Sequence, residues 1–397
     1  MTDAGRETWI TGAGIVSGLG EGRDAHWDAL DGGRIAPAAE AFAPYLVHPL
    51  AGVNFDTQIP KKGDQRQMEP WQRIGTYAAG LALDDAGIKG NADLLGRMDL
   101  VVAAGGGERD VSVDSALLSA LPGAADPAAF LNERLMNDLR PTLFLAQLSN
   151  LLAGNISIVH GVAGSSRTFM GEENAGVDAV RIARARIAAG QSEIALVGGA
   201  FNAERKDSVM LMNAGGFMWK GAPGSVWSRA PGGMGFGSMG AFVVLEAREH
   251  AQGRGAEPLA RLTYVASDQA GSAPGAAADA LQRLLAEAAG RLTPGLCAVI
   301  SGATGAEPVT AAERALLSSA HPDLPVRATG TYLGHGFEPQ FVLNLVLAAA
   351  SVKRGKLFAG NDESGFEQAF AGPLRQALVT SVGHWRGQGL GLVEAVD

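Results

Sequence analysis

Short apolar runs, most of them bordered by glycine and followed by residues with helical spacing, recur along the whole chain. Runs of this length are expected to be buried strands, and their alternation with helices is typical of α/β proteins with sheets covered on both faces. The clearest are residues 8–16, 99–104, 193–197, 241–246, 297–300 and 376–381. The pattern therefore predicts an α/β fold.

A helix is predicted to begin near Glu69 and to end by Gly87. Its apolar side chains recur three or four residues apart and form one stripe that must cover a sheet: Ile74, Tyr77, Ala78, Leu81 and Ala82. Further along, residues 156–159 are predicted to be a strand, residues 161–166 a turn, and Glu172 to open a helix that closes at Gly190.

The pattern turns polar at residues 248–257 and a new strand is predicted at residues 259–266. We therefore divide the chain into two halves, residues 1–250 and 251–397. The glycine- and alanine-rich stretch at residues 271–278 is interpreted as a surface loop, because a helix is predicted directly after it, at residues 281–289.

Composition narrows the class of protein. The 397 residues are 47% hydrophobic, which is enough for a large buried core, and the net charge of −9 argues against a general nucleic-acid binder. One cysteine, Cys297, excludes an internal disulfide and a multi-cysteine metal site. The polar N-terminus does not resemble a signal peptide and no apolar stretch is long enough to span a membrane, so we expect a cytoplasmic protein.

The segment at residues 140–200 carries the chemistry. It ends in Gly198-Gly199-Ala200, and three further motifs accompany it along the chain: Ile10-Thr11-Gly12-Ala13-Gly14, Ser228-Arg229 and Val244-Leu245-Glu246. The order of these motifs resembles the β-ketoacyl-acyl-carrier-protein synthase family of the elongating type. The resemblance implies the thiolase-like layered αβαβα fold with two duplicated halves. It also implies a dimer formed across a long strand after Gly154.

Members of this family use a cysteine nucleophile at a helix N-terminus and two histidines. An alignment without gaps places Glu173 at the cysteine position, and a carboxylate cannot replace a thiolate as the acyl carrier, because a mixed anhydride would hydrolyse. Cys297 does not replace it, since it lies in an apolar run and is interpreted as a small buried hydrophobe.

The two histidine positions differ from each other. The turn of residues 301–305, where the first histidine is expected, contains none, whereas His335 stands at the second position, with a structural or a functional role left open. In the C-terminal loop, His384, Trp385 and Arg386 replace the usual phenylalanine gate and paired glycines, and are expected to narrow or close the pocket.

These departures resemble the chain-length-factor branch, in which glutamine replaces the cysteine and the subunit pairs with an active synthase. Glu173 then has three open roles: stabilising the helix start through its dipole, assisting decarboxylation, or shaping a substrate tunnel. We expect helix-start amides to keep Glu173 ionised. The combination of Gly171-Glu172-Glu173 with Trp71, Gln72 and Arg73 is most similar to atypical subunits for very-long-chain fatty acids of bacterial lipid A.

Lys61, Lys62 and Arg66 form a basic turn that resembles the family's receiving patch for acidic acyl carrier protein, although a merely solvated turn is an equal alternative. We expect a subunit of fatty-acid or polyketide-type elongation that binds acyl carrier protein and forms a heterodimer with a cysteine-bearing synthase, a homodimer being the alternative. A self-sufficient condensing or decarboxylating enzyme and a carrier-binding scaffold are the competing functions. No metal and no cofactor are expected.

Overall fold

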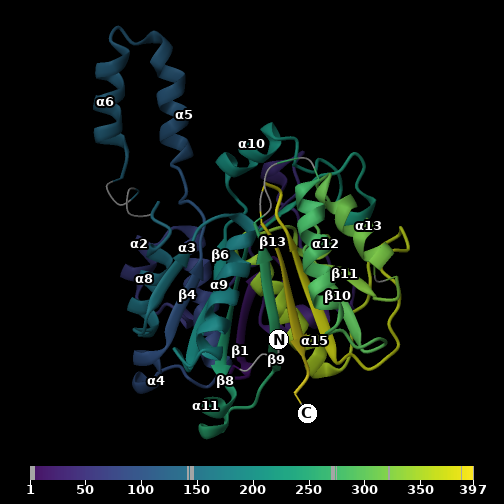
Figure 1. The fold of residues 1–397 in the computed structure, drawn as a ribbon. Helices are drawn as coiled ribbons and strands as arrows, with labels where there is room; N and C mark the ends of the chain where they lie inside the picture. The colour runs from purple at the N-terminus through teal and green to yellow at the C-terminus, as the bar shows by residue number, and fades with distance from the viewer. Residues whose placement is uncertain are drawn as a thin grey trace.

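The computed structural model describes residues 5–140, 143, 147–269, 273, 275–320, 322–385 and 387–396. One mixed sheet runs through the molecule in the order β5-β4-β6-β8-β1-β9-β13-β12-β10-β11, with the short β2 beside β1 (Figure 1). Its strands are β1 (Thr8–Ser17), β2 (Gly20–Glu21), β4 (Asp99–Ala103), β5 (Ser166–Phe169), β6 (Ile194–Phe201), β8 (Met239–Ala247), β9 (Ala260–Asp268), β10 (Cys297–Ser301), β11 (Val326–Ala328), β12 (Gln376–Val382) and β13 (Gln388–Glu394). The six runs predicted as strands all lie on strands of this sheet.

The sheet consists of two copies of one motif. From β1 outward, β8 and β6 pair antiparallel and β4 and β5 follow parallel. From β9 outward, β13 and β12 pair antiparallel and β10 and β11 follow parallel. The two series meet where β1 pairs antiparallel with β9. This repetition confirms the duplicated thiolase-like architecture, while the boundary at residue 250 stays a prediction.

Helices form the other layers. The central pair, α9 (Glu172–Ala188) and α15 (Gln340–Arg354), shares one apolar core with strands of both halves. Helices α3 (Pro70–Asp85) and α8 (Leu151–His160) pack on the outer face of the first half, and α12 (Ala276–Ala289) and α13 (Val309–Ala320) cover the second. The predicted helix after Glu69 is α3, with Glu69 and Gln72 forming its capping box.

The remaining elements are shorter. They are α1 (Arg23–Asp31), α2 (Lys62–Gln67), α4 (Ala92–Arg97), α10 (Lys206–Ala214), α11 (Arg248–Gly253), α14 (Gly330–Leu333) and the small parallel pair β3 (Val47–His48) and β7 (Phe236–Gly237). Helices α5 (Val111–Ala120) and α6 (Pro127–Asp138) form a hairpin that projects from the body (Figure 1). Among the described residues, no helix combines the length and apolar content that crossing a membrane requires.

One predicted strand is wrong. Residues 156–159 belong to helix α8, and the next strand is β5, which falls partly where a turn was predicted. A short apolar run fits a strand and one side of a helix equally well, and here Leu152 and Ile156 lie buried on one helical face while Ile158 is exposed. A long strand directly after Gly154 is therefore excluded, and β5 is the edge strand of the first half.

Candidate active site

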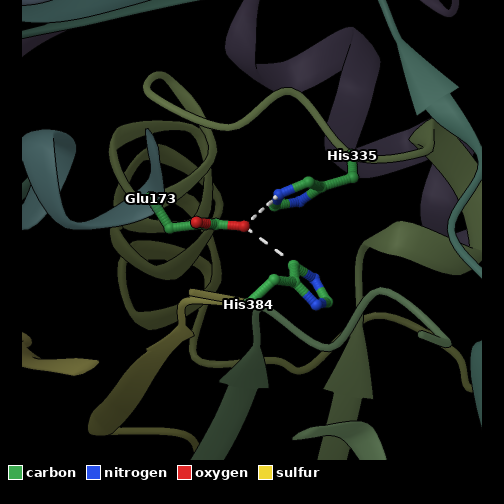
Figure 2. A group of neighbouring side chains, drawn as sticks. All are labelled: Glu173, His335 and His384. Carbon is green, nitrogen blue, oxygen red and sulfur yellow. Dashed lines mark hydrogen bonds and ion pairs between the residues drawn. The ribbon is translucent and has the colours of Figure 1, made fainter. Parts of the chain in front are cut away.

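Glu173 is the second residue of α9, at the centre of the molecule. The chain enters this helix through Gly171, whose φ of 118° is a conformation that favours glycine, and the buried face of α9 fixes the helix between the two halves. The Glu173 side chain is only 2% exposed and points toward two histidines, His335 and His384 (Figure 2). The site thus lies where the first half meets loops of the second.

His335 stands on the loop between α14 and α15. Its backbone N–H donates to Gly235 O at 2.8 Å and its carbonyl accepts from Gly237 N at 2.9 Å, so the loop is tied to the first half. A side chain at Gly237 would clash, because its Cβ would lie 1.8 Å from Leu333 O. Held in this way, His335 Nε2 donates a hydrogen bond of 2.9 Å to Glu173 Oε1.

His384 comes from the loop between β12 and β13. Its Nε2 lies 3.8 Å from Glu173 Oε1 and 3.0 Å from Thr304 Oγ1, and its side chain is 1% exposed. Although the turn of residues 301–305 contains no histidine of its own, His384 reaches it from the opposite loop. Sequence spacing could not reveal this, because the two loops are distant along the chain and meet only through the β10–β12 pairing.

The hydrogen bond from His335 contributes most to keeping Glu173 charged. Burial alone would raise the pKa of Glu173, but the hydrogen bond that His335 donates, together with smaller contributions from neighbouring groups, outweighs burial and lowers this pKa below the ordinary range. Burial lowers the pKa of His384 to about 4. Glu173 is ionised, as expected from the sequence, but the histidines do more for this than the helix-start amides to which the expectation assigned it.

Two polar atoms of the site have no hydrogen-bond partner among the described residues. They are Glu173 Oε2 and His384 Nδ1, both fully buried. Buried polar atoms are nearly always paired, and unpaired ones mark strain, an active group or a missing ligand. The site is thus chemically incomplete as it stands.

A cavity of about 330 Å³ adjoins the cluster. Its wall includes a residue close to each member of the cluster: Glu172 beside Glu173, Phe337 near His335, and Trp385 beside His384. The ring of Phe337 lies 4.7 Å from the ring of His335. Phe337 and Trp385 both line this cavity, and the narrowing or closing of the pocket by the loop of His384 stays a prediction. Arg386, named with the same loop, lies outside the described residues.

Glu338 also lines this cavity and was missed in the sequence. Burial raises its pKa to about 7, with a further contribution from the nearby charge of Glu173. One sequence signal could have identified Glu338 as a site residue. It is an acidic residue three positions after His335, directly behind a glycine-rich turn. Glu338 therefore titrates near neutral pH on the wall of the cavity, while the neighbouring Glu173, which does not line the cavity, is ionised.

The other sequence candidates lie elsewhere. Cys297 is buried on β10, and burial raises the pKa of its thiol to about 12, so it is unreactive. Lys61, Lys62 and Arg66 are exposed at the start of and along α2, and Lys62 forms an ion pair of 2.5 Å with Asp56. The structure does not bring this basic turn into the cluster of Glu173.

Comparison with solved structures agrees with the fold. The chain aligns over 99% of its length, and over the whole of each match, with the ishigamide ketosynthase/chain length factor (TM-score 0.80, 19% identity) and with a beta-ketoacyl synthase from Burkholderia phymatum STM815 (TM-score 0.81, 20% identity). At this identity the likeness concerns the fold alone.

Sequence comparison is more specific. The 3-oxoacyl-[acyl-carrier-protein] synthase 2 proteins of Vibrio harveyi and Rhizobium meliloti are 28% and 26% identical to 65% of this chain. The matched region spans only 61% and 63% of those relatives. The family model described as "Beta-ketoacyl synthase, N-terminal domain" matches residues 6–251. Because this match covers more than half of the sequence, the chain belongs to the beta-ketoacyl synthase family.

Proposed function

We propose that this chain is a non-condensing subunit of fatty-acid or polyketide-type elongation, comparable to a chain length factor, that works beside a cysteine-bearing synthase. The observation that carries the proposal is the buried, ionised Glu173 at the position of the family's nucleophile. Its carboxylate is engaged by His335, and it cannot hold an acyl group as a thioester. The substrates are acyl chains on a carrier protein, with very-long-chain acids as one candidate.

Decarboxylation by Glu173 and His335 is the competing enzymatic function. A malonyl group brings its own carboxylate, and an ionised Glu173 in a buried site would repel it at close range. The remaining alternative is a scaffold that binds carrier protein without chemistry. The cavity beside the cluster favours a subunit that accommodates part of an acyl chain over an inert scaffold.

Pairing with a second subunit is supported by the edge of the sheet. Within the described residues, β5 pairs only with β4, so its other edge is available for main-chain pairing. The flanking Ile158 and Met170 are 72% and 68% exposed. We propose that β5, in place of the strand expected after Gly154, forms the interface of a heterodimer in the cytoplasm.

The basic turn is the proposed docking point for the carrier protein. Lys61 and Arg66 are exposed, and the next helix, α3, begins with Pro70 and Trp71, of which Trp71 lines the cavity. The basic turn and the cavity-lining Trp71 are thus only a few residues apart along the chain. Electrostatic steering suits a basic patch on a protein whose net charge is −9.

The test is condensation by the purified chain with acyl-carrier protein and malonyl-carrier protein, followed by mass spectrometry. No 3-oxoacyl product is expected from the wild type or from Glu173→Cys, because the histidine arrangement differs from that of an active synthase. Product from the wild type that survives Cys297→Ala would overturn the proposal. Carbon dioxide release that both Glu173→Gln and Glu173→Ala abolish would instead establish the decarboxylase.

The partner is tested separately by co-purification from the native cell and native mass spectrometry. One copy of this chain with one cysteine-bearing synthase is expected, with a buried area above about 2,000 Å² as in permanent complexes. A stable homodimer that exchanges with no synthase of the same cell would contradict the heterodimer.

A further inference from the structure

The cluster of Glu173, His335 and His384 has the composition of a metal site. It combines one carboxylate and two imidazoles, the ligand types that zinc and related divalent transition metals take in proteins with an open coordination position. One ligand atom from each residue lies within 4.8 Å of the other two. We propose that these three side chains bind a single divalent transition-metal ion of the zinc type, an inference that goes beyond the proposed function and does not depend on a partner subunit.

The spacing of the atoms supports this assignment. A tetrahedral ion bound at about 2.0–2.1 Å holds its ligand atoms about 3.3 Å apart. Glu173 Oε1 lies 2.9 Å from His335 Nε2 and 3.8 Å from His384 Nε2, and all three ligand atoms lie within 4.8 Å of one another. Side-chain shifts of at most about 1.5 Å would therefore bring every pair to the required spacing.

The unpaired atoms give independent support. Glu173 Oε2 is buried without a hydrogen-bond partner among the described residues, and the side chain that carries it is 2% exposed. A hydrogen-bonded cluster that served only to fill space would leave such an atom unsatisfied at a cost of about 1–3 kcal/mol. A cation beside the carboxylate would offset this cost, because it attracts the negative charge that both oxygens share.

The proposed site is buried beside a cavity and would keep a free coordination position. The wall of the cavity of about 330 Å³ includes Glu172, Phe337 and Trp385, which stand one or two residues along the chain from the three ligands. Three protein ligands leave a four-coordinate ion one position for water or for a carbonyl or carboxylate oxygen. His384 Nε2 is hydrogen-bonded to Thr304 Oγ1, and this bond would have to break before His384 could bind the ion.

The test uses the full chain, stripped of metal with a chelator and dialysed. Zinc is titrated by calorimetry, and cobalt(II) by visible absorption, which reports coordination number. We expect one zinc per chain and the intense cobalt bands of a four- or five-coordinate ion. Glu173→Gln and His384→Ala are expected to weaken zinc binding at least about tenfold.

Two variants serve as controls. Glu172→Gln removes the adjacent carboxylate and is expected to leave zinc affinity unchanged, and Thr304→Val removes the competing hydroxyl and is expected to preserve or increase it. The wild-type cobalt spectrum needs no variant, so the proposal stays testable if a substitution prevents folding. Absence of stoichiometric zinc, a six-coordinate cobalt spectrum, or equal zinc affinity in folded Glu173→Gln would each overturn it.

Discussion

Helices α9 and α15 occupy corresponding places in the two halves, yet their first turns differ in kind. In α9, Glu173 leaves one carboxylate oxygen unpaired. In α15, Gln340 accepts from Gly336 N at 3.0 Å and donates to Thr329 Oγ1 at 3.1 Å, and Asn344 accepts from Thr329 Oγ1 at 2.7 Å. The same architectural position is therefore closed by hydrogen bonds in one half and left chemically open in the other.

The difference separates a structural polar network from a reactive one. A buried network in which every polar group is hydrogen-bonded stabilises one arrangement of the core. Removing one side chain leaves its hydrogen-bond partners unpaired in apolar surroundings. An incompletely paired group contributes less to stability and is available to a ligand. Substitutions in the two helices should therefore differ mainly in whether they affect folding or function.

The largest effect on stability is expected from Asn344→Leu. Asn344 is fully buried, and its loss removes the acceptor of the Thr329 hydroxyl and the side-chain donor to the Ser301 carbonyl. We expect a loss of about 3 kcal/mol in the free energy of unfolding, measured with urea. If Asn344→Leu costs less than Glu173→Gln, the contrast between the two helices is wrong.

Glu338→Gln is expected to give a change of comparable size with the opposite sign. Because the folded-state pKa of Glu338 is about 7, against an ordinary 4.5, its contribution to stability is complete below pH 4.5 and is lost as pH rises through 7. Glutamine cannot ionise, so the variant should exceed the wild type by up to about 3 kcal/mol at pH 8. Urea unfolding at pH 8 and pH 4.5 checks this, and an equal difference at both values would refute it.

Glu173→Gln should have a smaller effect and the reverse pH dependence. The folded-state pKa of Glu173 is lowered, so its carboxylate stabilises the folded state above the ordinary range and loses this contribution as pH falls through the folded-state pKa. Glutamine still accepts from His335 but without charge, at a cost of about 1–2 kcal/mol at pH 7. Unfolding at decreasing pH should show the two proteins converging, and a cost that grows toward acid would contradict the assignment.

The smallest effect on stability belongs to the basic turn. Charge reversal at Lys61, Lys62 and Arg66 together should leave the urea midpoint unchanged, since these side chains are exposed and surface ion pairs contribute little. Association with acyl carrier protein, followed by stopped-flow fluorescence, should slow and lose most of its salt dependence. Unchanged association at low ionic strength would show that α2 is only a solvated turn.

Much of the fold follows from local patterns. The glycine-bordered apolar runs identify the strands because a strand buried on both faces needs no polar alternation. Residues 156–159 were wrongly predicted as a strand, because this part of helix α8 contains a similar short run of apolar residues. The pairing of β1 with β9 could not be predicted, because it joins backbone groups from the two halves without a distinctive sequence.

The site was predictable in part. The positions of Glu173 and His335 follow from motifs that are local in sequence. The approach of His384 to Thr304 and the raised pKa of Glu338 depend on how distant loops pack and on how far water is excluded. These are properties of the assembled core, and no spacing along the chain reports them.

The shared core around α9 and α15 has a consequence for how the protein is made. Val177 and Val180 of α9 are buried in the same cluster as Phe341 and Leu345 of α15, a helix near the end of the chain. During synthesis on a ribosome, the first half therefore emerges with an uncovered apolar helix and must wait for α15. Apolar surface that is exposed in this way is what chaperones bind. His384 lies later in the chain than α15, so the cluster around Glu173 can be completed only after α15 has been synthesised.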